Sequence, residues 1–257
     1  MNDDGVFREA TFFQLFKSET DVSIHLLHLI MVVSVVFADV GDVRMILRQS
    51  HVVRAVSRVV NVAKRFRLVG LRTVDDHEKW LLNNSGQRAD FTLENLSGFN
   101  FNNTSLQSAK FVGSEFVGCD LCNSDLRDVD AFGASFMGAD LTDSDLSRAD
   151  LRGTKFHKAI LHGTKLINAD LRSGTLLNNS GENVKIVTSD LRQADLDNTE
   201  MNNVKLTGGC LSGASMKNAD CTGAIFDKCD FKDADLSGTN FTNANFKGAD
   251  LSNADLS

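Results

Sequence analysis

The chain has 257 residues, a formal net charge of −7, and no Pro or Tyr. Its length allows one long domain or two smaller ones. The five cysteines, an odd number, and the acidic N-terminus argue against a secreted disulfide framework and favour the reducing cytoplasm. The acidic balance also argues against direct binding of nucleic acid.

Residues 22–38 form the most apolar stretch, seventeen residues without a charged side chain. Seventeen residues is the shortest length at which a helix spans a bilayer. Two interpretations stay open: a buried helix or pair of strands, and a membrane-inserted segment. If the segment spans, the basic residues that follow it place the rest of the chain on the cytoplasmic side.

Residues 43–69 are predicted to form a basic amphipathic helix, because arginines recur on one face and apolar residues on another. Such a helix lies on an anionic membrane or docks on an acidic partner, or it is an ordinary helix with a solvated charged face. The residues expected to make a membrane or partner contact are Arg44, Arg48, Arg54, Arg58, Lys64, Arg65 and Arg67.

Residues 73–76 resemble a capping box and predict a short helix through Trp80, Leu81 and Leu82. Because a stack of repeats leaves an apolar end, we expect Trp80 and Leu81 to cover that end. The predicted division of the chain is an N-terminal helical region over 1–75, a capping helix and linker over 76–88, and a repeat region over 89–257.

From residue 91 to the end, every fifth position is apolar, in one unbroken register. Of 34 such positions from Phe91 to Leu256, 18 are Leu and 10 are Phe. We call this position the centre of a repeat. The residue two before the centre is usually small, the residue directly before it is often Asp, and the residues after it are mostly polar, as in Ala149-Asp-Leu-Arg-Gly153. A period of five fits neither a helix nor an ordinary strand and predicts a repeat architecture.

This motif resembles that of the pentapeptide repeat family. The resemblance implies a mainly β fold, a right-handed quadrilateral parallel β-helix, in which one repeat forms one side and four repeats form one coil. It also implies that the centre and the residue two before it point inward, which agrees with the two-residue alternation of a strand. Thirty-four repeats would make about eight coils, a pentapeptide-repeat solenoid that follows the helical N-terminal region.

Two irregularities are predicted within the repeats. Centres twenty residues apart should form four inner columns, but Gly181 cannot fill the axis and Asn178 to Gly181 has turn chemistry. We therefore expect a loop at 178–183, with the register kept on both sides. Glu94 and Phe99 stand where small residues belong, so we expect an irregular first coil.

The sequence offers little sign of catalytic or metal chemistry. Cys119 and Cys122 have the spacing of half a zinc site, but the repeat points Cys119 inward and Cys122 outward, and no second pair exists. His157 and His162 follow centres on adjacent sides without an activated nucleophile nearby. We predict no enzymatic activity, no metal and no cofactor.

The outward carboxylates are the candidate interaction residues. Residues 91–257 carry 23 acidic and 15 basic residues. We expect an acidic outer face formed by Asp120, Asp130, Asp140, Asp150, Asp170 and Asp190. The family resemblance implies that some members mimic B-form DNA and bind DNA gyrase and other type II topoisomerases.

The resulting hypothesis is a non-enzymatic protein-interaction scaffold. The rigid β-helix would present its surface to a protein partner, and residues 22–69 would tether it to a membrane or to a second partner. The alternative is a DNA-mimicking binder of DNA gyrase that modulates the topoisomerase or protects it from quinolones. The apolar last coil, at Leu256-Ser257, is expected to pair end to end with a second copy, unless the sequence is part of a longer protein.

Overall fold

The computed structural model describes residues 73–177 and 184–257. They belong to one compact unit, Val69–Ser257. The predicted apolar segment 22–38 and basic helix 43–69, with its seven basic contact residues, lie outside the described residues. Within the described ranges, no helix is both long and apolar enough to cross a bilayer.

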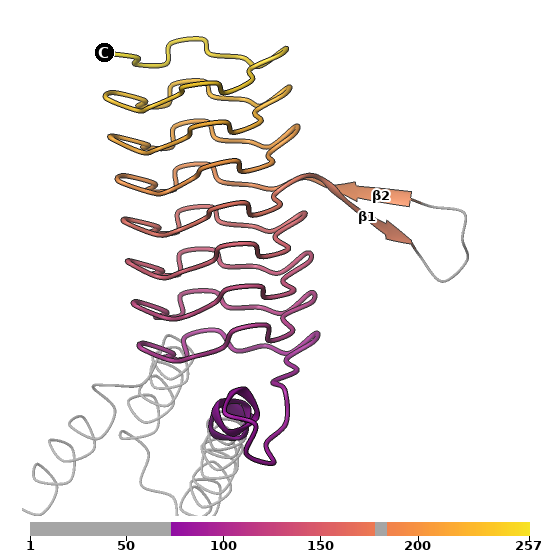
Figure 1. The fold of residues 1–257 in the computed structure, drawn as a ribbon. Coiled ribbons are helices and arrows are strands. Elements are labelled where there is room, and N and C mark those ends of the chain that lie inside the picture. The colour runs from indigo at the N-terminus through magenta and orange to yellow at the C-terminus, as the bar shows by residue number, and fades with distance from the viewer. Residues whose placement is uncertain (1–72, 178–183) are drawn as a thin grey trace, which may run out of the picture. The chain divides into compact units, whose positions relative to one another are not determined.

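From residue 89 onward, the chain rises in a stack of four-sided coils (Figure 1). Parallel bridges join residues twenty apart, as from Asp90 to Lys110 and from Lys110 to Asp130. Twenty residues are four repeats, so each repeat makes one side and each coil rests on the previous one. We number the sides by the first coil, in which sides 1 to 4 are residues 89–93, 94–98, 99–103 and 104–108.

A β-turn ends each side. The carbonyl of the centre accepts a hydrogen bond from the N–H three residues later, as from Glu94 to Phe91 at 3.0 Å. The third residue of the turn has positive φ, for example 55° at Asn123 and 67° at Gly133. Gly and Asn adopt this conformation most readily, which accounts for their frequency two residues after the centre.

The centres and the small residues two before them fill the axis. Phe116, Phe136 and Phe156 stack in successive coils of side 2, with ring centroids 5.1 and 5.2 Å apart. Some buried hydroxyls are satisfied within the turns: Ser114 and Thr154 each donate to the carbonyl of the centre three residues before, at 2.5 and 2.6 Å. The inner surface of the stack is therefore a continuous apolar core.

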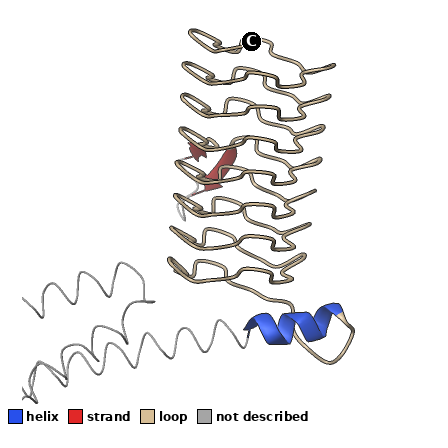
Figure 2. Ribbon diagram, turned by 90° about the vertical axis from the view of Figure 1, so that its left-hand side faces the viewer, coloured by secondary structure: helices blue, strands red, loops and turns tan. Residues whose placement is uncertain are grey.

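A two-stranded antiparallel hairpin, β1 (Gly174–Leu177) and β2 (Val184–Val187), leaves the stack (Figures 1 and 2). The predicted loop at 178–183 connects its strands and lies outside the described residues. The coils on either side are joined by bridges 35 residues apart, such as Lys155 to Asp190. Three repeats have thus left the stack, and the five-residue register continues beyond them as predicted.

The predicted inner columns are wrong beyond this hairpin. The amide of Leu171 donates to Lys205 at 2.8 Å, so Leu171 lies against Leu206 and not against Leu191. An insertion of fifteen residues is no multiple of twenty, so each column moves by one side. Ile186, a predicted centre, belongs to β2 and is 67% exposed.

The prediction of an irregular first coil is also wrong for the backbone. Leu96 and Phe101 donate to the second coil at 2.8 and 2.7 Å, with the same pattern as in later coils. Glu94 simply lies exposed, while Phe99 is half-buried and stacks on Phe101 at 6.0 Å. The hydrogen bonds between the first two coils are therefore kept although neither side chain fills the axis as the small residues of later coils do.

A helix over residues 73–81 precedes the first coil (Figure 2). Val74 and His77 are its buried residues, and Val74 belongs to the same apolar core as the coils. Of the predicted cap residues, Leu81 is half-buried and Trp80 is 38% exposed. The helix ends before Leu82, which lies in a turn.

Candidate interaction surface

The periodic carboxylates have a structural task that the sequence analysis missed. An Asp directly before a centre accepts the N–H of the residue after that centre, as Asp145 does from Ser147 at 2.9 Å. Asn does the same, since Asn95 accepts from Ser97 at 3.0 Å and Asn240 from Thr242 at 3.1 Å. The turn therefore needs an acceptor at this position but not a charge.

Several of these carboxylates are neutralised locally by an Arg two residues later. Arg152, Arg172 and Arg192 each bind the Asp of their own turn through two nitrogens, with Nη2 to Oδ2 distances of 2.6 to 2.7 Å. Hydrogen bonds from Arg192 hold the pKa of the Asp190 carboxyl below its ordinary value. These pairs neutralise part of the negative charge on sides 1 and 2.

Unbalanced negative charge gathers on side 3. Along the described residues of this side, seven carboxylates face one lysine, Lys217. The carboxylates are Asp120, Asp140, Asp143, Asp195, Asp197, Asp235 and Asp255. On the same basis, side 1 carries five acidic and six basic residues, side 2 carries six and four, and side 4 carries five and three.

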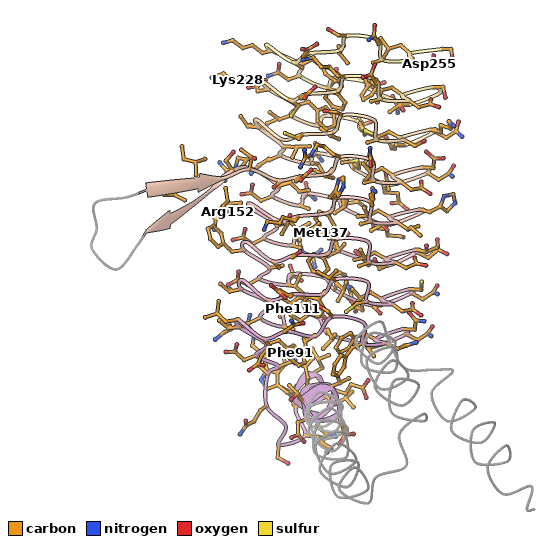
Figure 3. All side chains as sticks on the ribbon, turned by 180° about the vertical axis from the view of Figure 1, so that it is seen from behind. Phe91, Phe111, Met137, Arg152, Lys228 and Asp255 are labelled. Atoms are coloured by element: carbon orange, nitrogen blue, oxygen red, sulfur yellow. The ribbon has the colours of Figure 1, made fainter. Side chains whose placement is uncertain are left out.

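The six predicted acidic residues are accordingly not on one face. The bridges place Asp120 and Asp140 on side 3 and Asp190 on side 2. The remaining three lie on side 1: Asp130, Asp150 and Asp170. Figure 3 shows the separation: Arg152 and Lys228 of side 1 lie toward the hairpin, and Asp255 of side 3 points away on the opposite edge.

Side 3 is held rigid by its own hydrogen bonds. Asp197 accepts from the Ser215 hydroxyl at 2.5 Å and from the Lys217 amide at 2.9 Å, which ties two coils together. The hydrogen bond from the Ser237 hydroxyl, followed by that from Lys217, lowers the pKa of Asp235 to about 2. This carboxylate is therefore fully ionised at neutral pH.

Two coils interrupt the acidic side. Ile160, 41% exposed, stands where neighbouring coils have Asp140 and Asp195. Two residues on, His162 Nε2 lies 3.4 Å from Asn198 Nδ2 in the next coil. The second interruption is the coil of Ser215 and Lys217, so side 3 presents three groups of carboxylates, with Ile160 and His162 between the first two.

The cysteines point apart, as the repeat predicts. Cys119 is buried, and its thiol donates to the Leu96 carbonyl at 2.9 Å. Cys122 is half-exposed; burial, and next the carboxylates of Asp140 and Asp120, raise its pKa to about 12. Across residues 73–177 and 184–257, no three His, Cys, Asp or Glu side chains are grouped to hold a metal ion.

The histidines are also apart. His157 lies on side 2, and its buried Nδ1 meets no hydrogen-bond partner in the described part of the chain. His162 is on side 3. Among the described residues, no hydrogen bond joins either ring to a Ser, Thr or Cys side chain.

Comparison with protein families identifies this architecture. The model for pentapeptide repeats matches residues 88–128, 134–172, 189–218 and 219–257, in eight copies. The chain belongs to the pentapeptide repeat family. Membership implies a right-handed β-helix, and the unmatched residues between 172 and 189 coincide with the hairpin.

Solved pentapeptide repeat proteins are similar to this chain. HetL, involved in heterocyst differentiation regulation in the cyanobacterium Nostoc sp. strain PCC 7120, is 25% identical, with 65% of this chain and 84% of HetL covered and a TM-score of 0.34. QnrB1, a plasmid-mediated fluoroquinolone resistance protein, is 21% identical over 66% of this chain and 80% of its own, with a TM-score of 0.36. Rfr23 from the cyanobacterium Cyanothece 51142 is 19% identical over 71% and 98%, with a TM-score of 0.19. Comparison with curated proteins gives no match.

Proposed function

We propose that this pentapeptide repeat protein is a non-enzymatic interaction scaffold whose side 3 binds a basic surface of a protein partner. The observation that carries the proposal is the concentration of unbalanced charge on that side, with seven carboxylates against one lysine among its described residues. The family is generally non-enzymatic, which is consistent with this role.

The physical basis is a rigid array of like charges. Stacked coils fix the carboxylates in position, so a partner pays little ordering cost when it binds them. Aligned charges also accelerate encounter with a basic surface and discriminate against acidic ones. Ile160, exposed between two of the acidic groups, would add an apolar contact within the interface.

The turn chemistry supplies a matched experiment. Because Asn caps the same turns as Asp, Asp→Asn changes remove charge and keep the hydrogen bond. The side 3 variant changes four such residues, and the side 1 variant changes four others in the equivalent position. The side 3 set is Asp120, Asp140, Asp195 and Asp235, and the side 1 set is Asp90, Asp130, Asp150 and Asp170.

The measurement is quantitative capture of cellular proteins by the immobilised full chain, with mass spectrometry. We expect wild type and the side 1 variant to retain the same basic partner, and the side 3 variant to bind it at least tenfold more weakly. Binding should also weaken as salt rises. If the side 3 variant retains the partner as well as the side 1 variant does, the proposed surface is wrong.

The second candidate is a DNA-mimicking binder of DNA gyrase. The charge of side 3 favours it, because a mimic must present negative charge along one edge to a surface that binds phosphates. The test is a supercoiling assay with gyrase and micromolar full-length protein. Inhibition by wild type and by the side 1 variant, but not by the side 3 variant, would support this candidate; no inhibition by wild type would exclude it.

We further propose that residues 22–69, within the N-terminal region 1–75, tether the rod to a membrane or to a second partner. The support is the apolar run followed by the basic pattern in the sequence. In co-sedimentation, the full chain should pellet with vesicles of anionic lipid and not with neutral ones. A variant with Arg44, Arg48, Arg54 and Arg58 changed to Gln should stay in solution; equal pelleting of both proteins would contradict the basic helix as the contact.

A further inference from the structure

One histidine joins the helix over 73–81 to the first coil. His77 is 0% exposed. Its Nδ1 accepts a hydrogen bond from the Ala89 amide at 2.9 Å, and its Nε2 lies 3.0 Å from the Gln107 carbonyl oxygen. Ala89 opens the first coil on side 1 and Gln107 lies near its close on side 4, so a single ring holds both ends of that coil.

The two partners fix the state of the ring. An amide N–H can only donate and a carbonyl oxygen can only accept, so His77 must be neutral with its proton on Nε2. A second proton, on Nδ1, would point at the Ala89 N–H. The hydrogen bond between the Ala89 amide and His77 would then be lost, and the positive charge of the imidazolium would be buried away from solvent.

The surroundings of the ring also disfavour a positive charge. Burial lowers the pKa of His77 below its ordinary value, the hydrogen bond to Gln107 opposes this, Arg88 lowers the pKa further and Glu78 raises it. Arg88 is anchored to the first coil by a hydrogen bond from its Nε to the Ser108 carbonyl at 2.5 Å. Trp80, the only Trp of the chain, stacks on the His77 ring with centroids 5.3 Å apart.

We propose that His77 is a pH-sensitive latch, in which protonation of its ring releases the helix over 73–81 from the first coil. The released helix binds a proton on His77 more tightly than the docked helix does. Docking is therefore at full strength above pH 6.5 or so, the ordinary pKa of His, and weakens by up to about tenfold for each pH unit below it. The weakening stops below the pKa of the docked ring. This inference does not depend on the proposed function of side 3.

Two measurements on the full chain test the latch. Hydrogen exchange of residues 73–81, corrected for the intrinsic rate, should quicken between pH 7.5 and 5.5, while a peptide from the middle coils, residues 141–161, stays protected. Emission of Trp80 should change with the same midpoint, because the indole lies on the His77 ring. His77→Gln offers an uncharged donor and acceptor, so its helix should show no such pH dependence.

Three outcomes overturn the proposal. The first is equal protection of residues 73–81 at both pH values in wild type. The second is a His77→Gln variant that loses protection at low pH as wild type does. The third applies if the variant leaves the helix unprotected at every pH, so that only the wild type is informative. In the wild type, the midpoint of helix release should coincide with the titration of His77 followed by NMR. Separate midpoints reject the latch.

Discussion

The stacked phenylalanines of side 2 allow a sharp test of the core. Phe136 is fully buried between Phe116 and Phe156, with ring planes within 10° of parallel on both sides. Phe136→Ala removes a buried ring and leaves a cavity between two coils, a change that costs about 3 to 5 kcal/mol. Because two ring contacts are lost together, we expect the upper part of that range, about 4 kcal/mol. Phe136→Leu keeps most of the volume and should cost about 1.5 kcal/mol.

The assay is urea unfolding of the full chain, followed by circular dichroism and by hydrogen exchange of individual coils. Each coil contacts only its neighbours, so exchange should quicken first in the coils that hold the three rings. Met137→Ala, at the next position but 37% exposed, is the matched control and should change stability by less than about 0.5 kcal/mol. A cost below about 1 kcal/mol for Phe136→Ala would refute the inward assignment of the centres.

Three further outcomes are expected. Gly153 and Gly133 both have positive φ, but only an added Cβ at residue 153 would lie 2.6 Å from an atom of β2. Gly153→Ala should therefore lower the free energy of unfolding, measured in urea, by about 1 kcal/mol more than Gly133→Ala does. Equal losses of stability would mean that the hairpin does not pack against residue 153. Leu146→Asp places a charge in the core and should destabilise by about 4 kcal/mol or more, whereas Asp143→Ala in the same coil should be nearly neutral in that assay. Cys122, whose pKa is raised to about 12, should react with iodoacetamide at pH 8 at least tenfold more slowly than a small thiol, and an ordinary rate would contradict the raised pKa.

The inward and outward assignment of most repeats could be predicted because five residues make one side. Phe136 and Ala134, a centre and its small neighbour, are both fully buried, as the register indicates. The side on which a residue lies could not be predicted, because it depends on counting coils. An insertion of fifteen residues keeps the period of five and still moves each later residue to another side, so Asp190 lies on side 2.

The cap shows a second limit. Sequence reasoning placed a helix before the repeats and selected Trp80 because it is large and apolar. The structure buries Val74 and His77, three residues apart on one helical face, and uses the ring for hydrogen bonds to two backbone groups. The spacing of those two residues was a usable signal, but the amide and carbonyl they meet belong to positions 89 and 107, which no local pattern connects.

One source of the difference in charge between sides is the residue after the centre. On sides 1 and 2 that residue is Arg in three described turns, as at Arg152, which caps and neutralises its own Asp. On side 3 none of the described turns has Arg there, and Thr142 and Ser237 make the turn contact through hydroxyls at 2.6 Å, which do not neutralise the carboxylate. Thr142→Arg should therefore keep the turn and cancel one charge.

The expected change in unfolding free energy for Thr142→Arg is within about 0.5 kcal/mol, because an exposed ion pair replaces a hydroxyl contact. Capture of the basic partner, measured as for the side 3 variant, should nevertheless weaken, and the matched change Ser147→Arg on side 4 should leave it unaltered. A loss of more than about 1 kcal/mol in stability would show that Arg and Thr are not equivalent in this turn. The claim that the turn can be capped without regard to charge would then be wrong, because the stability of the fold would itself require the hydroxyl on side 3.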